Sequence, residues 1–385
     1  MRVAHVTATF PPYLGGAGTV AFHHAEGLAR RGHDVEVFTA RSAGAPPASA
    51  ATVHRLEPAW RTGNAPVLPA LAGLREFDVV HLHHPFIFGT ELLLAGRLRA
   101  RPPLVVSYHN ELIGEGRRRA LFTGWEATWG RVLLRVARRI LVVSDAHAAT
   151  VPGLSRIARA DPGKLSELPN GVDLDAFRPG GDEAGIRARH GIPADATVVA
   201  FVSALDRAHY LKRPELALAA LAAARDPGLH LLVVGGGEWL GRLRARAAAA
   251  GLGERTTFVG AMSHAELPDL LRAADALLVT SDRESFGIVL IEGMACGLPT
   301  VSTDPPGVLA VVREGTTGLL AQTGDAHALG AALDRLAGAP ELRVALGSAG
   351  RARCERRYGW AQIVDRLEAV YAELGECSPT LDGSP

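Results

Sequence analysis

The chain has 385 residues, of which 48% are apolar and 21% are charged. This composition excludes a wholly disordered chain, a collagen and a coiled coil, and the length predicts two domains. There are 41 Lys and Arg against 40 Asp and Glu, so the formal net charge is +1 and no bulk attraction to nucleic acid is expected.

Cysteine content and the N-terminus predict the compartment. The three cysteines are widely spaced and form no CxxC pair, which favours a reducing environment over a disulfide scaffold. The first residues lack the long apolar segment of a signal peptide, and the purest apolar run, residues 216–224, is too short to span a bilayer. We therefore expect a cytoplasmic protein.

The first half of the chain alternates short apolar strands with helical segments. The predicted strands cover residues 2–8, 34–39, 78–83, 104–108 and 140–144. A helix is expected over residues 19–31, with Gly32 at its end, and a long helix is expected to end at Arg138-Arg139.

The second half repeats this alternation. Its predicted strands cover residues 197–203, 229–234, 256–259, 276–280, 300–302 and 318–320, and its predicted helices cover 213–224, 239–250 and 360–374. Alternating strands and helices indicate two doubly wound parallel sheets, an α/β fold class. The turn-rich residues 169–173 and 179–181 mark the linker, and we expect the active site in a cleft between the halves.

Two glycine-rich turns follow predicted strands. Residues 15–18 (Gly-Gly-Ala-Gly) open the first helix, and Gly235 begins a run of three glycines after the strand 229–234. Such turns let backbone N–H groups approach a phosphate, although a tight turn needs them equally. An NAD or FAD enzyme should also carry an acidic residue after its second strand, and neither half does, so that class is disfavoured.

Histidines gather at the ends of two predicted strands. His81, His83 and His84 lie at the end of one strand, with His81 and His83 on the same face, and His109 follows the next strand. No nearby acidic or cysteine ligand completes a metal site, so histidines lining a polar cleft are favoured over metal ligands.

The segment 284–299 holds the most specific chemistry of the second half. Ser285, Phe286 and Gly287 are expected to open a helix whose free N–H groups can face a phosphate. Glu292 is a carboxylate within that apolar helix and needs a partner, for which a ribose diol is suitable. Glu284 precedes the helix, and Arg207 and Lys212 at another strand–helix junction suit a diphosphate. Solvated charges and a salt-bridged glutamate are the structural alternatives.

A basic, aromatic stretch covers residues 117–139. Its arginines alternate with Phe122, Trp125 and Trp129, a pattern that suits either a solvated helix face or contact with a membrane surface. The balanced overall charge favours the solvated face.

The chain resembles the retaining GT-B glycosyltransferases of family 4, the group 1 glycosyl transferases. The most specific feature of this resemblance is the Glu-x7-Glu element, which runs from Glu284 to Glu292. The resemblance spans nearly the whole chain. It includes the glycine loop at 15–18, the Tyr108-His109 strand end, the Pro-Asn-Gly-Val-Asp segment at 169–173 and the glycine turn at 235–237. It implies two Rossmann-like domains that face a central cleft.

The resemblance also implies a domain assignment. An acceptor-binding domain would comprise residues 1–172 with the helix 360–376, and a nucleotide-sugar-binding domain would comprise residues 173–359. Residues 377–385 would form a flexible tail.

The resemblance assigns roles to individual residues. Glu292 would hold the nucleotide ribose, Glu284 the donor sugar, and Arg207 and Lys212 the diphosphate, with His109 beside the transferred sugar. The catalytic set is thus His109, Arg207, Lys212 and Glu284. The donor-binding set is Gly16, Arg207, Lys212, Gly235, Glu284, Ser285, Phe286, Gly287, Ile288, Val289 and Glu292.

One departure affects this assignment: Ser203-Ala204-Leu205 stands where the family usually has Gly-Arg-Leu, which leaves Arg207 as the substitute cation. No Asp-x-Asp motif occurs in a suitable place, so no metal and no cofactor beyond the nucleotide sugar are expected.

The predicted activity is retaining, metal-independent transfer of a sugar from a UDP- or GDP-sugar to a hydroxyl acceptor, which is either a small molecule or lipid-linked. The alternatives are a nucleotide-sugar epimerase and a non-catalytic nucleotide-sugar-binding module. A lipid acceptor would bring residues 117–139 to the inner face of the membrane.

Overall fold

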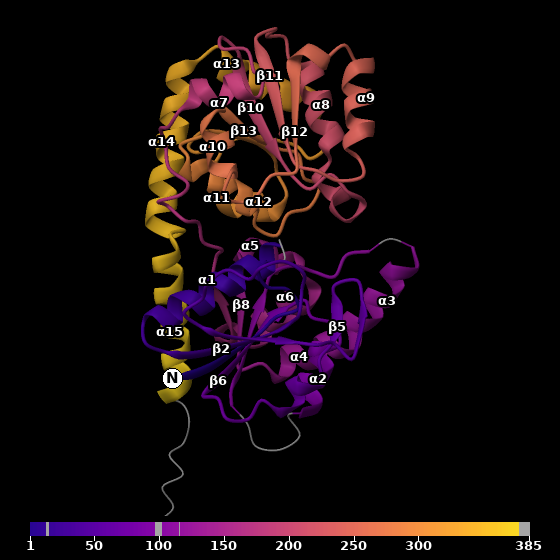
Figure 1. Ribbon diagram of the computed structural model, residues 1–385, viewed down its shortest axis with the longest axis vertical. Helices are drawn as coiled ribbons and strands as arrows, with labels where there is room; N and C mark the ends of the chain where they lie inside the picture. The colour runs from indigo at the N-terminus through magenta and orange to yellow at the C-terminus, as the bar shows by residue number, and fades with distance from the viewer. Residues whose placement is uncertain (13–14, 97–101, 115, 377–385) are drawn as a thin grey trace, which may run out of the picture. The chain divides into compact units, whose positions relative to one another are not determined.

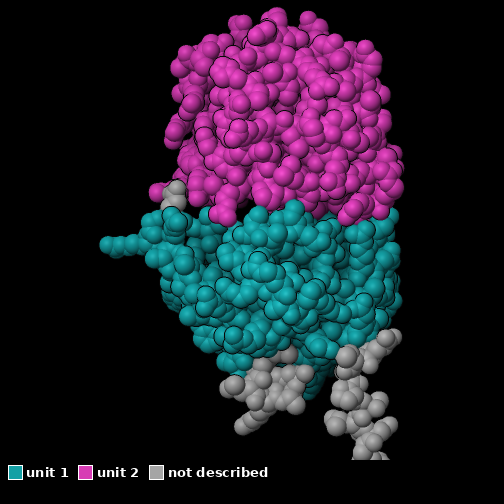
Figure 2. Space-filling view, turned by 180° about the vertical axis from the view of Figure 1, so that it is seen from behind, with its two compact units in different colours: residues 1–170, 360–385 teal, residues 171–359 magenta. Residues whose placement is uncertain are grey.

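The computed structural model describes residues 1–12, 15–96, 102–114 and 116–376. The described residues divide into two units, which Figure 2 colours separately. One comprises the described residues up to 170 together with the helix that begins at Trp360, and the other comprises residues 171–359. The sequence placed the boundary after residue 172, and the predicted tail 377–385 lies outside the described residues.

The first unit is built on a seven-stranded parallel sheet (Figure 1). In spatial order its strands are β3 (Thr52–Leu56), β2 (Asp34–Ala40), β1 (Arg2–Val6), β6 (Val79–His84), β7 (Leu104–Tyr108), β8 (Arg139–Val142) and β9 (Leu165–Glu167). An antiparallel hairpin, β4 (Trp60–Thr62) with β5 (Ala65–Val67), is inserted before β6. The helices are α1 (Gly16–Arg30), α2 (Gly89–Gly96), α3 (Arg117–Trp125), α4 (Arg131–Val136), α5 (Asp145–Thr150), α6 (Pro152–Ala160) and α15 (Trp360–Glu376).

Each face of this sheet has its own apolar core. One face contributes Ala4, Val80 and Val106 to a core with α2 and α4, and the other contributes Val3, Val79 and Val105 to a core with α1 and α15. This alternation follows the two-residue period of a strand. Helix α15 comes from the far end of the chain and lies beside α1 (Figure 1), with Ile363, Leu367 and Tyr371 fully buried.

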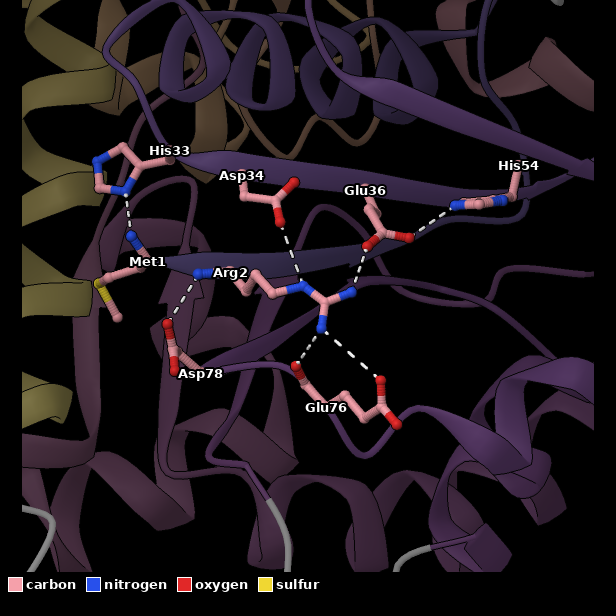
Figure 3. A network of polar contacts seen from close by, with 8 residues as sticks. All are labelled: Met1, Arg2, His33, Asp34, Glu36, His54, Glu76 and Asp78. Atoms are coloured by element: carbon pink, nitrogen blue, oxygen red, sulfur yellow. Dashed lines mark hydrogen bonds and ion pairs between the residues drawn. The ribbon is translucent and has the colours of Figure 1, made fainter.

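A polar network ties the amino ends of β1 and β2 together (Figure 3). The Arg2 guanidinium contacts Glu36 at 2.9 Å and Asp34 at 3.2 Å, and it donates to the Glu76 backbone carbonyl. Although burial opposes the shift, hydrogen bonds from His54 and Arg2 lower the pKa of Glu36. The network secures the sheet edge opposite the one where ligands bind in parallel α/β folds.

The second unit contains a six-stranded parallel sheet with the strand order 3-2-1-4-5-6 of a dinucleotide-binding fold. In spatial order its strands are β12 (Thr256–Gly260), β11 (Leu229–Val234), β10 (Thr197–Val202), β13 (Ala276–Val279), β14 (Thr300–Thr303) and β15 (Gly318–Ala321). Its helices are α7 (Glu183–Arg189), α8 (Pro214–Ala223), α9 (Leu240–Ala249), α10 (Leu267–Arg272), α11 (Ile288–Ala295), α12 (Pro306–Val311), α13 (Ala326–Ala337) and α14 (Pro340–Arg357).

The predicted fold class, two α/β units with parallel sheets, is confirmed, and the predicted strands lie within two residues of the observed ones. Two details were wrong. Helix α1 begins at Gly16, so the first glycine turn lies mostly inside its first turn. The expected long helix ending at Arg138-Arg139 is two helices joined by a π-helical turn, and Arg139 is the first residue of β8.

Of the helices that the structure describes, none combines the length and the apolar character needed to cross a membrane. Cys296 and Cys354 are buried and free, and Cys377 lies outside the described residues.

Candidate functional site

Most candidate residues of the second unit lie at the carboxyl edge of its sheet. Arg207 and Lys212 bound a 3-10 helix that follows β10, and Glu284 lies in the loop after β13. Strands β10 and β13 are neighbours in the sheet, and the strand order reverses between them: β11 and β12 follow on one side, and β14 and β15 on the other. The two loops therefore flank the switch point where α/β sheets bind ligands.

Lys212 and Glu284 are brought together across this switch point. The Lys212 ammonium donates to the Glu284 carboxylate, whose side chain is 11% exposed. The Thr280 hydroxyl donates to the Lys212 carbonyl at 2.8 Å, and the Asp282 N–H donates to the Leu211 carbonyl at 2.8 Å. The two loops are therefore one hydrogen-bonded surface rather than separate solvated segments.

Arg213 was missed by sequence reasoning and joins the same two loops. Its guanidinium donates to Asp282 at 2.6 Å and to Glu215 at 2.6 Å. Its backbone is left-handed, with φ at 50°, which is unfavourable for a residue with a Cβ and is common at functional sites. The sequence carries no signal for this conformation, because arginine has no preference for it.

Glu292 is buried on α11, as its apolar surroundings predicted. Its carboxylate is paired with Nε2 of His264 at 2.7 Å, and this hydrogen bond raises the pKa of His264 above 6.5. His264 was not anticipated, since it lies 28 residues away in sequence. The buried charge has its required partner, and half of the His264 side chain remains exposed beside it.

The segment before α11 is fixed by packing. Phe286 is buried edge-to-face against Tyr358, and Gly287 precedes the helix with φ at 82°, where a side chain would be strained. Ile288 and Val289 form the first turn of α11, so the helix begins three residues later than the motif Ser285–Gly287 suggested. A Cβ at Gly307 would stand 2.2 Å from the Glu284 carbonyl, so this glycine lets α12 approach the loop.

Gly235 has a packing reason for its identity. Its φ is 144°, and a Cβ there would lie 1.8 Å from the Ser203 carbonyl oxygen. The loop after β11 therefore touches the loop after β10, which carries Arg207. Arg207 itself is exposed, and its backbone N–H donates to Glu238 at 3.1 Å.

In the first unit, Gly16 and His109 also lie at the carboxyl edge of their sheet. Gly16 is the first residue of α1, which no side chain caps among the described residues. His109 follows β7 directly and is buried, and Nε2 of its ring is 2.9 Å from Nδ1 of His83. Burial lowers the pKa of His109 to about 3, so its imidazole is neutral at neutral pH.

The histidine cluster differs from the prediction in its members and in its position, because His81, His83 and His84 are buried and do not line a cleft. His81 and His83 share the face covered by α1 and α15, as expected, and His5 of β1 joins them. His84 points to the other face, where it stacks on Tyr108 and Trp125. Within the described ranges, His5, His81 and His83 are the group whose nitrogens are spaced for a metal ion. However, His5 Nδ1 and His83 Nε2 already face each other at 3.0 Å.

The basic stretch 117–139 does not form one amphipathic face. Trp125 is buried, and its indole N–H donates to Glu91 at 2.5 Å. Arg139 is paired with Glu373 at 2.6 Å. Leu121, at 67% exposed, and Trp129, at 41%, leave apolar surface among the remaining arginines.

Comparison with known proteins agrees with this geometry. Residues 182–353 match the family model for glycosyl transferases group 1, and residues 14–176 match the model for glycosyltransferase family 4. The D-inositol 3-phosphate glycosyltransferase of Mycobacterium tuberculosis is 34% identical over 423 aligned residues, covering 98% of this chain and 83% of the relative.

Solved structures share the fold. Sucrose-phosphate synthase from Thermosynechococcus elongatus superposes with a TM-score of 0.81 at 24% identity, covering 98% of this chain and 100% of that chain. Anabaena Alr3699/HepE in complex with UDP gives a TM-score of 0.76 at 19% identity, covering 97% and 100%.

The fold and the two family models define a GT-B glycosyltransferase. The chain belongs to the glycosyl transferases group 1, and the family assignment made from its sequence is confirmed.

Proposed function

We propose that the chain transfers a sugar from a nucleoside diphosphate sugar to a hydroxyl acceptor, with retention at the anomeric carbon and without a metal ion. The observation that carries the proposal is the Lys212–Glu284 pair at the carboxyl edge of the second unit's sheet, followed in sequence by the buried Glu292 on α11. Buried carboxylates suit sugar and ribose hydroxyls, and an adjacent cation suits a phosphate.

The proposed roles follow from chemistry. Glu292 binds the ribose diol and Glu284 the donor sugar, while Gly16 and the backbone from Ser285 to Val289 offer N–H groups to phosphate. The Gly235 N–H donates to the Gly260 carbonyl at 2.9 Å, so Gly235 serves the donor site through the close packing of its loop. Lys212 and Arg207 neutralise the charge that develops on the departing diphosphate, which is the work a divalent cation does in other transferases. His109 contacts the transferred sugar.

Retention requires the acceptor hydroxyl to attack on the side from which the diphosphate leaves. The C–O bond to the phosphate breaks, the sugar passes through an oxocarbenium-like state, and the new C–O bond forms on the same face. The departing phosphate oxygen takes the acceptor proton, so no separate protein base is required. Structural neighbours solved with UDP and with UDP-glucose support a uridine donor, and GDP-sugars remain the second candidate.

We assign the binding site of the acceptor to the first unit. A groove of about 340 Å³ there is lined by Phe88, Leu112 and Phe122, with Arg118 at its side. This lining suits an acceptor with an apolar part, either a free small molecule or a lipid-linked one whose membrane the exposed Leu121 and Trp129 would meet.

The activity is tested by incubating the full chain with UDP-, GDP- and ADP-sugars and an acceptor panel, with and without EDTA. We expect nucleoside diphosphate release coupled to a product whose anomeric proton coupling matches that of the donor, and no loss with EDTA. An epimerised donor formed without acceptor would favour the epimerase alternative, and no donor consumption would favour a binding module. Inversion, or loss of activity with EDTA, would contradict the mechanism.

Membrane contact is tested separately by sedimentation with liposomes of anionic lipid. A variant with Arg117, Arg118 and Arg119 changed to Gln serves as the control. If the wild type sediments with the liposomes and this variant does not, the result supports a membrane-facing acceptor site. If the wild type does not sediment with them, the result supports a soluble acceptor.

A further inference from the structure

The carboxyl half of the first sheet is polar on the face covered by α1 and α15. Along this face, the apolar residues Val3, Val79 and Val105 are succeeded two residues later by His5, His81 and Ser107. His83 and His109 continue the same faces of β6 and β7. These four histidines and His24 of α1 are thus buried together where a hydrophobic core would otherwise extend.

Three of these histidines form a hydrogen-bonded chain. His5 Nδ1 lies 3.0 Å from His83 Nε2, and His83 Nδ1 lies 2.9 Å from His109 Nε2. The planes of the His83 and His109 rings differ by 8° and their centroids are 5.2 Å apart. With the two nitrogens 2.9 Å apart, this separation puts both nitrogens near the line between the rings, so the N–H and the lone pair point along the contact. His81 is stacked beside the chain but is bonded to Tyr371 and Ser107 instead.

The three rings are neutral, so each has one N–H and one lone pair. Burial lowers the pKa of His5 and of His109 to about 3 and that of His83 well below its usual value. Two arrangements then satisfy both hydrogen bonds. Either every ring carries its proton on Nδ1 and the chain donates from His5 toward His109, or every ring carries it on Nε2 and the chain donates in reverse.

The His5 end of this hydrogen-bonded histidine chain selects between the two arrangements. His5 Nε2 is buried and has no partner among the residues that the structure describes. Neither ring nitrogen of the neighbouring His24 has a partner among the described residues, so this cluster already holds one buried N–H without an acceptor. A proton on His5 Nε2 would add a second, and such groups are rarer in proteins than unused lone pairs. The proton of His5 therefore belongs on Nδ1, and this sets the donor-to-acceptor direction of both hydrogen bonds, from His5 through His83 to His109.

We propose that His5 and His83 are positioning residues that hold His109 in its Nδ1–H tautomer, so that His109 meets its ligand as a hydrogen-bond donor and not as a base. The Nδ1 of His109 is not bonded within the described part of the chain, and the residue keeps 9% of its surface exposed. The donor role rests on the proposed function, in which His109 contacts a sugar; the tautomer does not.

The ligand chemistry follows from the tautomer. An Nδ1–H group pairs with a lone-pair oxygen, such as a sugar hydroxyl or a phosphate oxygen, and cannot accept the acceptor's proton. This agrees with a reaction in which the leaving phosphate takes that proton.

The test is side-chain tautomer assignment by long-range ¹H–¹⁵N correlation NMR on the full chain labelled at histidine, with His109→Phe to identify the His109 signals. We expect the wild-type His109 to be protonated on Nδ1. In His83→Phe, where the donor to Nε2 is lost, we expect His109 to shift to the Nε2–H tautomer that free histidine favours. His81→Phe is the matched control, since His81 lies on the same strand and face but outside the chain, and it should leave the tautomer unchanged.

A rescue variant covers the case in which His83→Phe does not fold. His83→Asn can place an amide N–H near the position of His83 Nδ1, and we expect it to retain the Nδ1–H form of His109. A proton on Nε2 of wild-type His109 would overturn the proposal, and so would an Nδ1–H tautomer that persists in folded His83→Phe. Since this measurement needs no substrate, its result tests the His109 tautomer independently of whether the protein transfers a sugar.

Discussion

At the scale of single residues, Glu292 places a carboxylate inside an otherwise apolar helix, where a charge without a partner would be costly. His264 supplies the partner from another part of the second unit. The same pair presents a half-exposed imidazole next to a buried carboxylate, which is an arrangement that a ribose diol can join.

Glu292→Gln should weaken UDP binding by about tenfold to a hundredfold, because hydrogen bonds to charged groups contribute about 1.5–3 kcal/mol. Titration calorimetry measures the change. Glu341→Gln, in the first turn of α14, is the control and should bind UDP like the wild type. An unchanged affinity in Glu292→Gln would remove Glu292 from the proposed donor site.

The His264–Glu292 pair should also make stability depend on pH. The hydrogen bond to Glu292 raises the pKa of His264 above 6.5 in the folded chain. The stabilisation is therefore fully present below the unfolded pKa of 6.5 and is lost as pH rises through the raised folded value. Unfolding of the wild type and of His264→Phe by urea at several pH values measures it, and a wild-type advantage that grows with rising pH would contradict this sign.

At the scale of elements, the strands were predictable because buried parallel strands are short apolar runs between turns. Helix α1 was placed too late, because Gly16 and Gly18 were assigned to a turn although helices tolerate glycine in their first turn. Strands β3 and β9 and the hairpin β4–β5 were not predicted, since β3 (Thr-Val-His-Arg-Leu) is not an apolar run and the other three strands have three residues each. Contacts such as Lys212 with Glu284 could be expected only as neighbours at one sheet edge, whereas Arg213 and His264 gave no local signal.

The glycine turn after β11 tests whether close backbone packing shapes the donor site. Gly235→Ala should destabilise the chain by about 2–4 kcal/mol, because its Cβ would overlap the Ser203 carbonyl and its φ is 144°. Gly241→Ala is the control: it lies in α9 with open space around the new Cβ, and it should be neutral or stabilising by up to about 1 kcal/mol. Equal thermal stability of the two variants would refute this packing role.

At the scale of the whole molecule, the chain has two units with separate cores, and the first unit is completed by a helix from the far end of the sequence. Three of its residues, Ile363, Leu367 and Tyr371, are fully buried against the first unit's sheet and α1. The stability of the first unit should therefore depend on residues that follow the second unit in sequence.

Leu367→Ala should destabilise the first unit by about 2–5 kcal/mol, the usual cost of truncating a fully buried leucine. Hydrogen exchange should then accelerate in residues 1–170 and α15 but not in residues 171–359. Val344→Ala, at a position that is 68% exposed on α14, should change stability by less than about 0.5 kcal/mol. Faster exchange spread over both units in Leu367→Ala would contradict the separation of the cores.

Hydrogen exchange of the full chain with UDP, GDP and ADP tests the central claim most directly, since it locates nucleotide binding without knowledge of the acceptor. We expect at least one of the three to slow exchange in the loop 205–212, the turn 235–238 and the segment 284–292 of the second unit. Glu292→Gln should lose this protection at the same nucleotide concentration. Protection confined to residues 1–170, or none with any of the three nucleotides, would contradict a nucleotide-sugar donor site in the second unit.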